Sequence, residues 1–182
     1  MNNETLNELL ENELKDLYDA EKQLVRALPK MAKACDSDDL ADAIRNHMAE
    51  TQNHVTRLEK VFDLMEMPAK GKSCKGMKGL IQEGSEILED EDRGPLRDLA
   101  IIAGAQRVEH YEISAYGTAR AVAEQLEKSQ VASLLLQTEN EEKMADEKLS
   151  EIAKAIYASD EPEDEEEMAH VSGGRSRSSR RQ

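Results

Sequence analysis

The chain has 182 residues, with 39 Asp and Glu against 24 Lys and Arg, and a formal net charge of −15. This length is enough for one domain with a sizeable core. An acidic surface repels phosphate backbones, which argues against general affinity for nucleic acids. Aromatic residues make up only 3% of the chain, and the helix-forming residues Ala, Leu, Glu, Lys, Gln and Met dominate. The composition therefore predicts an all-α protein.

The sequence favours a cytoplasmic protein that does not enter a membrane. Its two cysteines, Cys35 and Cys74, form no CxxC pair, and its acidic, amphipathic start is unlike a targeting peptide. No apolar run approaches the roughly 20 residues that a membrane-spanning helix needs. Free cysteines without a secretion signal are typical of a reducing compartment.

Four long helices are predicted by apolar residues that recur at spacings of three and four. Thr5 and Glu8 are typical of a capping box at the start of the first helix. Ser37 is the expected N-cap of the second. The four helices are expected to cover residues 5–34, 38–65, 96–126 and 130–157.

Residues 66–92 connect the second and third long helices and include a shorter amphipathic helix over 76–90. This segment is long enough to return along the molecule, whereas the other connections are short turns between antiparallel neighbours. Such an arrangement is the one-crossover topology of ferritin-like bundles. We expect a folded domain over residues 1–158. Residues 159–182, an acidic run followed by an Arg/Ser-rich run, are expected to form a disordered tail.

Carboxylates lie near the midpoints of all four long helices, at Glu21, Glu50, Glu112 and Glu142. A bundle of helices of equal length brings these midpoints to one level. Glu109 adds a fifth carboxylate one helical turn from Glu112. Buried like charges must be protonated or neutralised by cations. A metal centre is the economical explanation of the pattern.

Two histidines strengthen this interpretation. His47 and His54 bracket Glu50 on an arc of roughly 60° of one helix. A single histidine on a core face is usually a hydrogen-bonded core residue, but the pair indicates that at least one is a ligand. Asp146 follows Glu142 by four residues and is a further candidate. Hard carboxylate oxygens with one or two imidazoles suit iron or manganese, and two divalent cations would offset the buried charges.

Other polar residues near these positions have a functional and a structural interpretation. Tyr18 and Tyr116 each lie one turn from a candidate ligand. They could donate hydrogen bonds to the carboxylates, and ordinary helix packing is the alternative. Glu139, Glu141 and Glu147, which neighbour Glu142 in the sequence, are expected to face solvent.

Several stretches form one further pattern, in the order YDAEKQL with ALPKM, HMAETQNHVTRLEKVF, GLIQE, AQRVEHYEISAYGT and EEKMADEKL. Together they resemble the YciE/YciF family of ferritin-like bacterial stress proteins, over roughly residues 9–158. The resemblance implies a ferritin-like four-helix bundle with a long crossover that carries an extra shorter helix. It also implies a di-metal site, ferroxidase-like chemistry with oxygen or peroxide, and a homodimer.

The ferritin-like pattern has a Glu on each of two helices and Glu-x-x-His on each of the other two. Here Asn53 and Ala145 stand where the histidines are expected. His54 or His47, and Asp146, are the substitutes. We expect two iron ions (or manganese) and no catalytic residue separate from the ligands, with Glu50 and Glu142 as bridges. The predicted ligands are Glu21, Glu50, His54, Glu109, Glu112, Glu142 and Asp146.

Two other functions are compatible with the sequence. The chain could be a non-enzymatic helical stress protein with a vestigial metal site, which the missing Glu-x-x-His pairs favour. Nucleic-acid contact through an arginine-rich tail is a third hypothesis, and the acidic body of the protein opposes it. The arginines concerned are Arg175, Arg177, Arg180 and Arg181.

Overall fold

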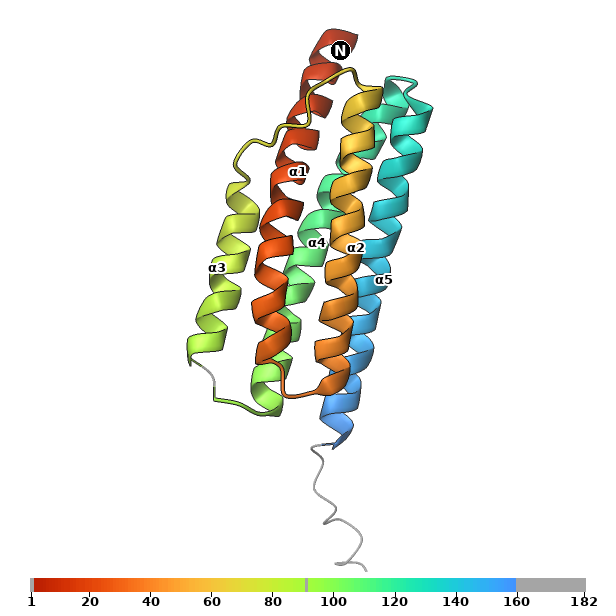
Figure 1. Cartoon of the computed structure of the whole chain (residues 1–182). Coiled ribbons are helices and arrows are strands. Elements are labelled where there is room, and N and C mark those ends of the chain that lie inside the picture. The colour runs from red at the N-terminus through yellow and green to blue at the C-terminus, as the bar shows by residue number, and fades with distance from the viewer. Residues whose placement is uncertain (1, 91, 160–182) are drawn as a thin grey trace, which may run out of the picture.

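The computed structural model describes residues 2–90 and 92–159, and the regular structure within them is entirely helical (Figure 1). The all-α prediction is confirmed. None of these helices is long and apolar enough to cross a membrane. Residues 160–182, which hold most of the predicted tail, lie outside the described residues. The helices are α1 (Asn3–Ala34), α2 (Asp38–Leu64), α3 (Lys75–Asp90), α4 (Pro95–Gln125) and α5 (Ser129–Ser159).

The helix starts follow local capping chemistry. Ser37 caps α2 as predicted, because its hydroxyl accepts a hydrogen bond from the Leu40 N–H. The capping box predicted at Thr5 and Glu8 is wrong. The side chain of Asn2 caps α1 instead, by accepting a hydrogen bond of 2.9 Å from the Thr5 N–H. The helix therefore begins two residues earlier than expected.

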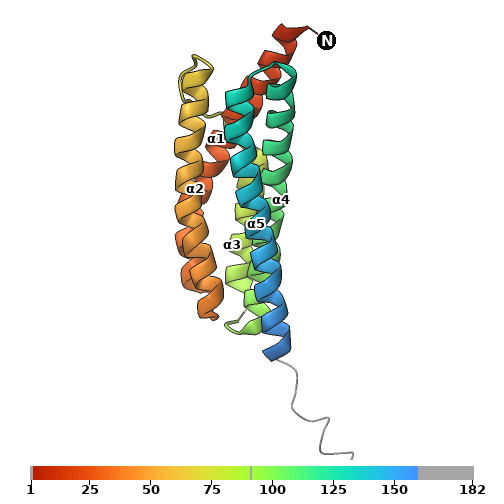
Figure 2. The same ribbon diagram turned by 90° about the vertical axis from the view of Figure 1, so that its right-hand side faces the viewer.

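The four long helices lie side by side and enclose one interior (Figures 1 and 2). α1 and α2 form one antiparallel hairpin, and α4 and α5 form another. α2 packs on α1 and α5, and α4 packs on the same two helices, which closes the ring. The shorter α3 packs on the outside of α1 and α4 and returns the chain along the molecule, as the length of the crossover predicted.

The interior holds two apolar clusters with a polar layer between them. One cluster includes Leu24, Ile44, Ile101 and Ile152, together with Met77 of α3. The other lies toward the opposite end of the long helices and includes residues of all four. On each long helix the polar layer falls between the stretches that supply the two clusters. Its buried members are Glu21, His47, Thr51, His54, Glu109, Glu112, Thr138, Glu139 and Glu142.

Candidate metal centre

Four carboxylates and two imidazoles form the centre of the polar layer. All four long helices contribute to it, and each of the six side chains belongs to a residue that is at most 8% exposed. Charged groups at such depth must be neutralised by partners, protons or metal ions. We call these residues the cluster. They are Glu21, His47, His54, Glu109, Glu112 and Glu142.

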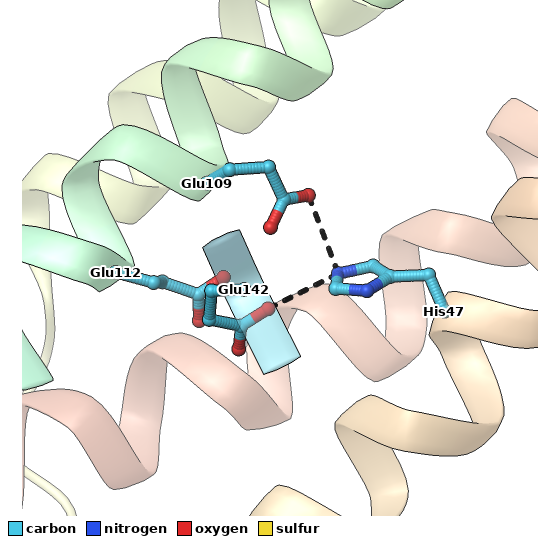
Figure 3. A group of neighbouring side chains, drawn as sticks. All are labelled: His47, Glu109, Glu112 and Glu142. Atoms are coloured by element: carbon cyan, nitrogen blue, oxygen red, sulfur yellow. Dashed lines mark ion pairs between the residues drawn. The ribbon is translucent and has the colours of Figure 1, made fainter. Parts of the chain in front are cut away.

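One half of the cluster joins α2, α4 and α5 (Figure 3). His47, Glu109, Glu112 and Glu142 each offer a ligand atom, and these atoms lie within 4.8 Å of one another. His47 Nε2 lies 3.4 Å from Glu109 Oε1 and 3.9 Å from Glu142 Oε2. One imidazole and three carboxylates thus point toward a common space.

The other half joins α1, α2 and α5. Glu21, His54 and Glu142 form a second group of ligand atoms within the same limit of 4.8 Å. His54 Nδ1 lies 2.9 Å from Glu142 Oε1 and 3.5 Å from Glu21 Oε1. Glu142 belongs to both groups, with one oxygen toward His47 and the other toward His54. Its carboxylate is therefore shared by the two groups, either of which could hold a metal ion.

Most polar atoms of the cluster form no hydrogen bond within the described part of the chain. Both oxygens of Glu112 and Glu142 are unpaired, as are both ring nitrogens of His47. Glu21, Glu109 and His54 each leave one further atom unpaired. Buried polar atoms are normally paired, and an unpaired one costs about 1–3 kcal/mol. Oxygen and nitrogen donors left in this state fit hard divalent cations.

The electrostatics show how the cluster is neutralised without metal. Burial raises the pKa of Glu109 to about 8 and holds the pKa of Glu112 well above its ordinary value. Burial lowers the pKa of the histidines, but the facing carboxylates outweigh it. The pKa of His47 is about 9 and that of His54 about 10. At neutral pH the cluster therefore holds protons, which metal ions would displace.

Two of the predicted ligands lie outside the cluster. The Glu50 side chain is 51% exposed, and its Oε2 lies 3.7 Å from His47 Nδ1 on the outer side. At 100° per residue, Glu50 is roughly 80° from the middle of the buried face of α2. Asp146 turns toward α4, where its Oδ1 accepts a hydrogen bond of 2.9 Å from Gln106. The expectation that Glu50 would join Glu142 at the centre is wrong.

The sequence left open whether His47 or His54 is a ligand, and the structure buries both within the cluster. The distinguishing signal is the apolar stripe of α2. Both histidines stand on this stripe, at the three- and four-residue spacing of Leu40, Ile44 and Leu58, whereas Glu50 is off it.

Glu141 is a supporting residue that sequence reasoning missed. It was expected to face solvent, but its Oε2 lies 2.9 Å from His54 Nε2. Its two oxygens also accept hydrogen bonds of 2.6 and 3.0 Å from Arg57. Because Nε2 is engaged by Glu141, Nδ1 is the nitrogen of His54 that faces Glu142. A carboxylate behind a histidine is the usual way to orient a metal-binding imidazole.

Of the two other glutamates that were expected to face solvent, one does and one does not. Glu147 is exposed as predicted. Glu139 is buried, contrary to prediction. Its carboxylate accepts hydrogen bonds of 2.7 Å from Arg120 and 2.6 Å from Lys143, which compensate its charge at the edge of the polar layer.

The two tyrosines have different roles. Tyr116 is fully buried, and its hydroxyl donates to Glu21 Oε1, as expected for a residue that supports a ligand. Tyr18 instead donates to Glu59 at 2.8 Å, and its ring packs edge-on against Phe62. For Tyr18 the packing alternative is confirmed.

Comparison with known proteins shows the family of this chain. The family model of a domain of unknown function (DUF892) matches residues 5–160. The chain belongs to this family. It is 42% identical over 154 residues to Protein YciF of Escherichia coli (strain K12), which covers 84% of this chain and 93% of that protein. The predicted resemblance to the YciE/YciF family is confirmed.

Solved structures of other proteins share this fold. The crystal structure of the E. coli stress protein YciF matches with a TM-score of 0.81 and 40% identity, over 84% of this chain and 97% of that one. YcfI from Rhodopseudomonas palustris matches with a TM-score of 0.78 and 39% identity, over 80% and 92% of the two chains. A Xanthomonas campestris protein, 20% identical over 85% and 94%, shares the fold with a TM-score of 0.68.

Proposed function

We propose that this protein is a ferritin-like di-metal carboxylate protein, in which the four long helices form the ferritin-like bundle. The observation that carries the proposal is the position of Glu142, which is shared by two buried groups of ligand atoms. His47, Glu109, Glu112 and Glu142 would hold one iron or manganese ion. Glu21, His54 and Glu142 would hold the other.

The charges of the cluster support two divalent ions. Four carboxylates balance two doubly charged cations when both imidazoles are neutral. The apolar clusters border the polar layer on its two sides along the helices. His54 is held by Glu141, and Glu21 is held by Tyr116. These contacts orient the donor atoms before an ion arrives.

The proposed reaction is the oxidation of Fe(II) by oxygen or peroxide. Bound iron supplies the electrons, and the protein supplies the ligand set and controls access of water. The relative YciF is described as a stress protein, and we assign this chain a role in the stress response on that basis. We also propose a cytoplasmic homodimer. The free thiols of Cys35 and Cys74 fit a reducing compartment, and the dimer follows from the family resemblance.

Anaerobic titration with Fe(II) tests the metal site. We expect about two ions per chain, as in other di-metal bundles of this kind. Oxygen or peroxide should then consume Fe(II) faster than a buffer control does. Glu21→Ala and Glu112→Ala should each reduce both binding and rate, because each removes a ligand from a different helix.

Glu83→Ala is the matched control, because Glu83 is exposed on α3, away from the cluster. Glu139 is unsuitable as a control, since it is buried and paired with Arg120 and Lys143. Wild-type protein that binds no more iron than Glu21→Ala does, and oxidises it no faster than buffer, would contradict the proposed function.

A second candidate is a non-enzymatic helical stress protein with a vestigial metal site. One observation favours it: the raised pKa values of His47 and His54 allow two imidazolium ions to balance part of the carboxylate charge without metal. Iron content after purification from iron-supplemented cells separates the two functions. The non-enzymatic function predicts no bound iron and no metal-dependent rise in the melting temperature.

A further inference from the structure

A groove of about 670 Å³ runs between the first half of α2 and the second half of α5. Its deeper walls are apolar and include Leu28 of α1, Ile44 of α2 and Leu149 of α5. Its inner end reaches the polar layer, so it connects the cluster with the surface of the molecule.

Two members of the cluster, His47 and Glu109, line this groove. Both are more than nine-tenths buried, with exposed fractions of 8% and 2%. Both ring nitrogens of His47, and Oε2 of Glu109, have no hydrogen-bond partner among the described residues. The other four members of the cluster do not line the groove and are fully buried. The inner end of the groove therefore meets unpaired donor atoms of His47 and Glu109. It reaches the cluster from this side alone.

The lining of the groove is strongly acidic toward solvent. Lys148 is its single lysine, and it contains no arginine. Lys148 pairs with Glu151 at 3.7 Å. Arg45 and Arg57, from outside the lining, pair with two further carboxylates, which leaves three of the six without a lysine or arginine partner among the ion pairs of the described residues. A cleft lined by one sign of charge, with walls of low dielectric constant, raises the local concentration of counter-ions. The carboxylates of the groove lining that lie outside the cluster are Asp39, Asp42, Glu50, Glu141, Glu147 and Glu151.

We propose that this groove is the access route by which divalent cations reach the cluster. The inference rests on the proposed function and assigns an order to the two positions. The position formed by His47, Glu109, Glu112 and Glu142 opens onto the groove and exchanges its ion first. The position formed by Glu21, His54 and Glu142 lies behind it. The apolar walls offer a cation no donor atoms, so the groups that a cation meets are the carboxylates of the lining and then His47 and Glu109.

The test measures the rate at which Co(II) binds to the metal-free full chain under anaerobic conditions, followed by its visible absorption in a stopped-flow instrument. The double variant Glu147→Lys/Glu151→Lys reverses two exposed charges in the groove lining. The matched control, Glu83→Lys/Glu86→Lys, makes the same change of net charge at exposed positions of α3.

At low ionic strength we expect the groove variant to bind Co(II) about tenfold more slowly than wild type, and the control to bind at nearly the wild-type rate. The difference should shrink at high salt, because salt screens exposed charges. The number of Co(II) ions bound and their absorption spectrum should be unchanged in both variants, which shows that each is folded.

Equal association rates in the two double variants, with intact stoichiometry, would overturn the access route and leave the proposed function standing. A groove variant that loses bound Co(II) without a slower association would overturn the route as well. If the Glu21→Ala variant bound Co(II) as wild type does, the ion would bind outside the cluster. That result would overturn both the access route and the proposed function.

Discussion

At the scale of one residue, Glu112 illustrates how the cluster lowers the folding stability of the metal-free protein. It is fully buried, and neither carboxylate oxygen has a hydrogen-bond partner among the described residues. Burial, followed by the charges of Glu21 and Glu142, raises its pKa well above the ordinary value. In the unfolded chain the same carboxyl ionises near pH 4.3. Folding above that pH must therefore take up a proton, and this contribution becomes more unfavourable as the pH rises.

Replacement of Glu112 by Gln should accordingly stabilise the metal-free protein at pH 7.5, by about 1–3 kcal/mol. At pH 5 the difference should be smaller, because the free-energy cost of taking up the proton on folding falls as the pH approaches the pKa of the unfolded carboxyl. Urea unfolding in the presence of a chelator measures both values. A variant that is less stable than wild type at both pH values would show that Glu112 is not a source of buried-charge strain.

Glu141 is a second single residue with a specific role, which is to orient a member of the cluster from outside it. Its contact with His54 Nε2 orients the imidazole so that Nδ1 faces Glu142. We expect Glu141→Ala to weaken metal binding about 10- to 100-fold, as for other residues that support a metal-binding histidine. Glu141→Gln should restore part of the affinity, because its amide oxygen can still accept from Nε2. Calorimetric titration with Mn(II) measures the three affinities, and equal values for Ala and wild type would rule out the positioning role.

At the scale of elements, α3 is held in place by close contact with α4. A Cβ atom added at Gly76 would lie 2.9 Å from Cε2 of the Tyr111 ring. That ring cannot easily move, because its hydroxyl donates to Asp16 and lies 2.9 Å from the sulfur of Cys74. The crossover thus requires glycine at this position for steric reasons rather than for backbone conformation.

Gly76→Ala should destabilise the protein by about 1–3 kcal/mol, the usual cost of overpacking. Gly79→Ala is the matched change on the same helix, where an added Cβ meets nothing within 4 Å. It should stabilise by about 0.5–1 kcal/mol, because alanine favours the helix. Equilibrium unfolding in urea gives both values. Equal effects of the two substitutions would mean that α3 does not pack on Tyr111 in solution.

At the scale of the whole molecule, the described core is complete without the tail. Both apolar clusters lie within residues 10–156. The sequence beyond Ser159 is acidic and then Arg/Ser-rich, and ordering such residues would cost about 1–2 kcal/mol each with little apolar surface to offset it. Truncation after Ser159 should therefore leave the melting temperature nearly unchanged in a calorimetric scan. A drop of many degrees would show that the tail packs on the body.

The sequence by itself determined the helices, the crossover and the level at which the carboxylates lie. These features depend on local periodicity, capping and helix length, which are readable residue by residue. Glu21, Glu109, Glu112 and Glu142 could be placed near one level for this reason. That the cluster holds metal remains a prediction.

Only the tertiary structure decided which polar side chains turn inward. The rotation of a helix about its axis depends on the neighbours it packs against, and a shift of one position moves a side chain by about 100°. On α2 the apolar stripe already distinguished the two histidines of the cluster from Glu50, but on α5 no such signal identified the roles of Glu139 and Glu141. α5 lies between α2 and α4, so Glu141 meets Arg57 on one side and Glu139 meets Arg120 on the other. No local pattern around position 142 contains those partners, because they stand on other helices.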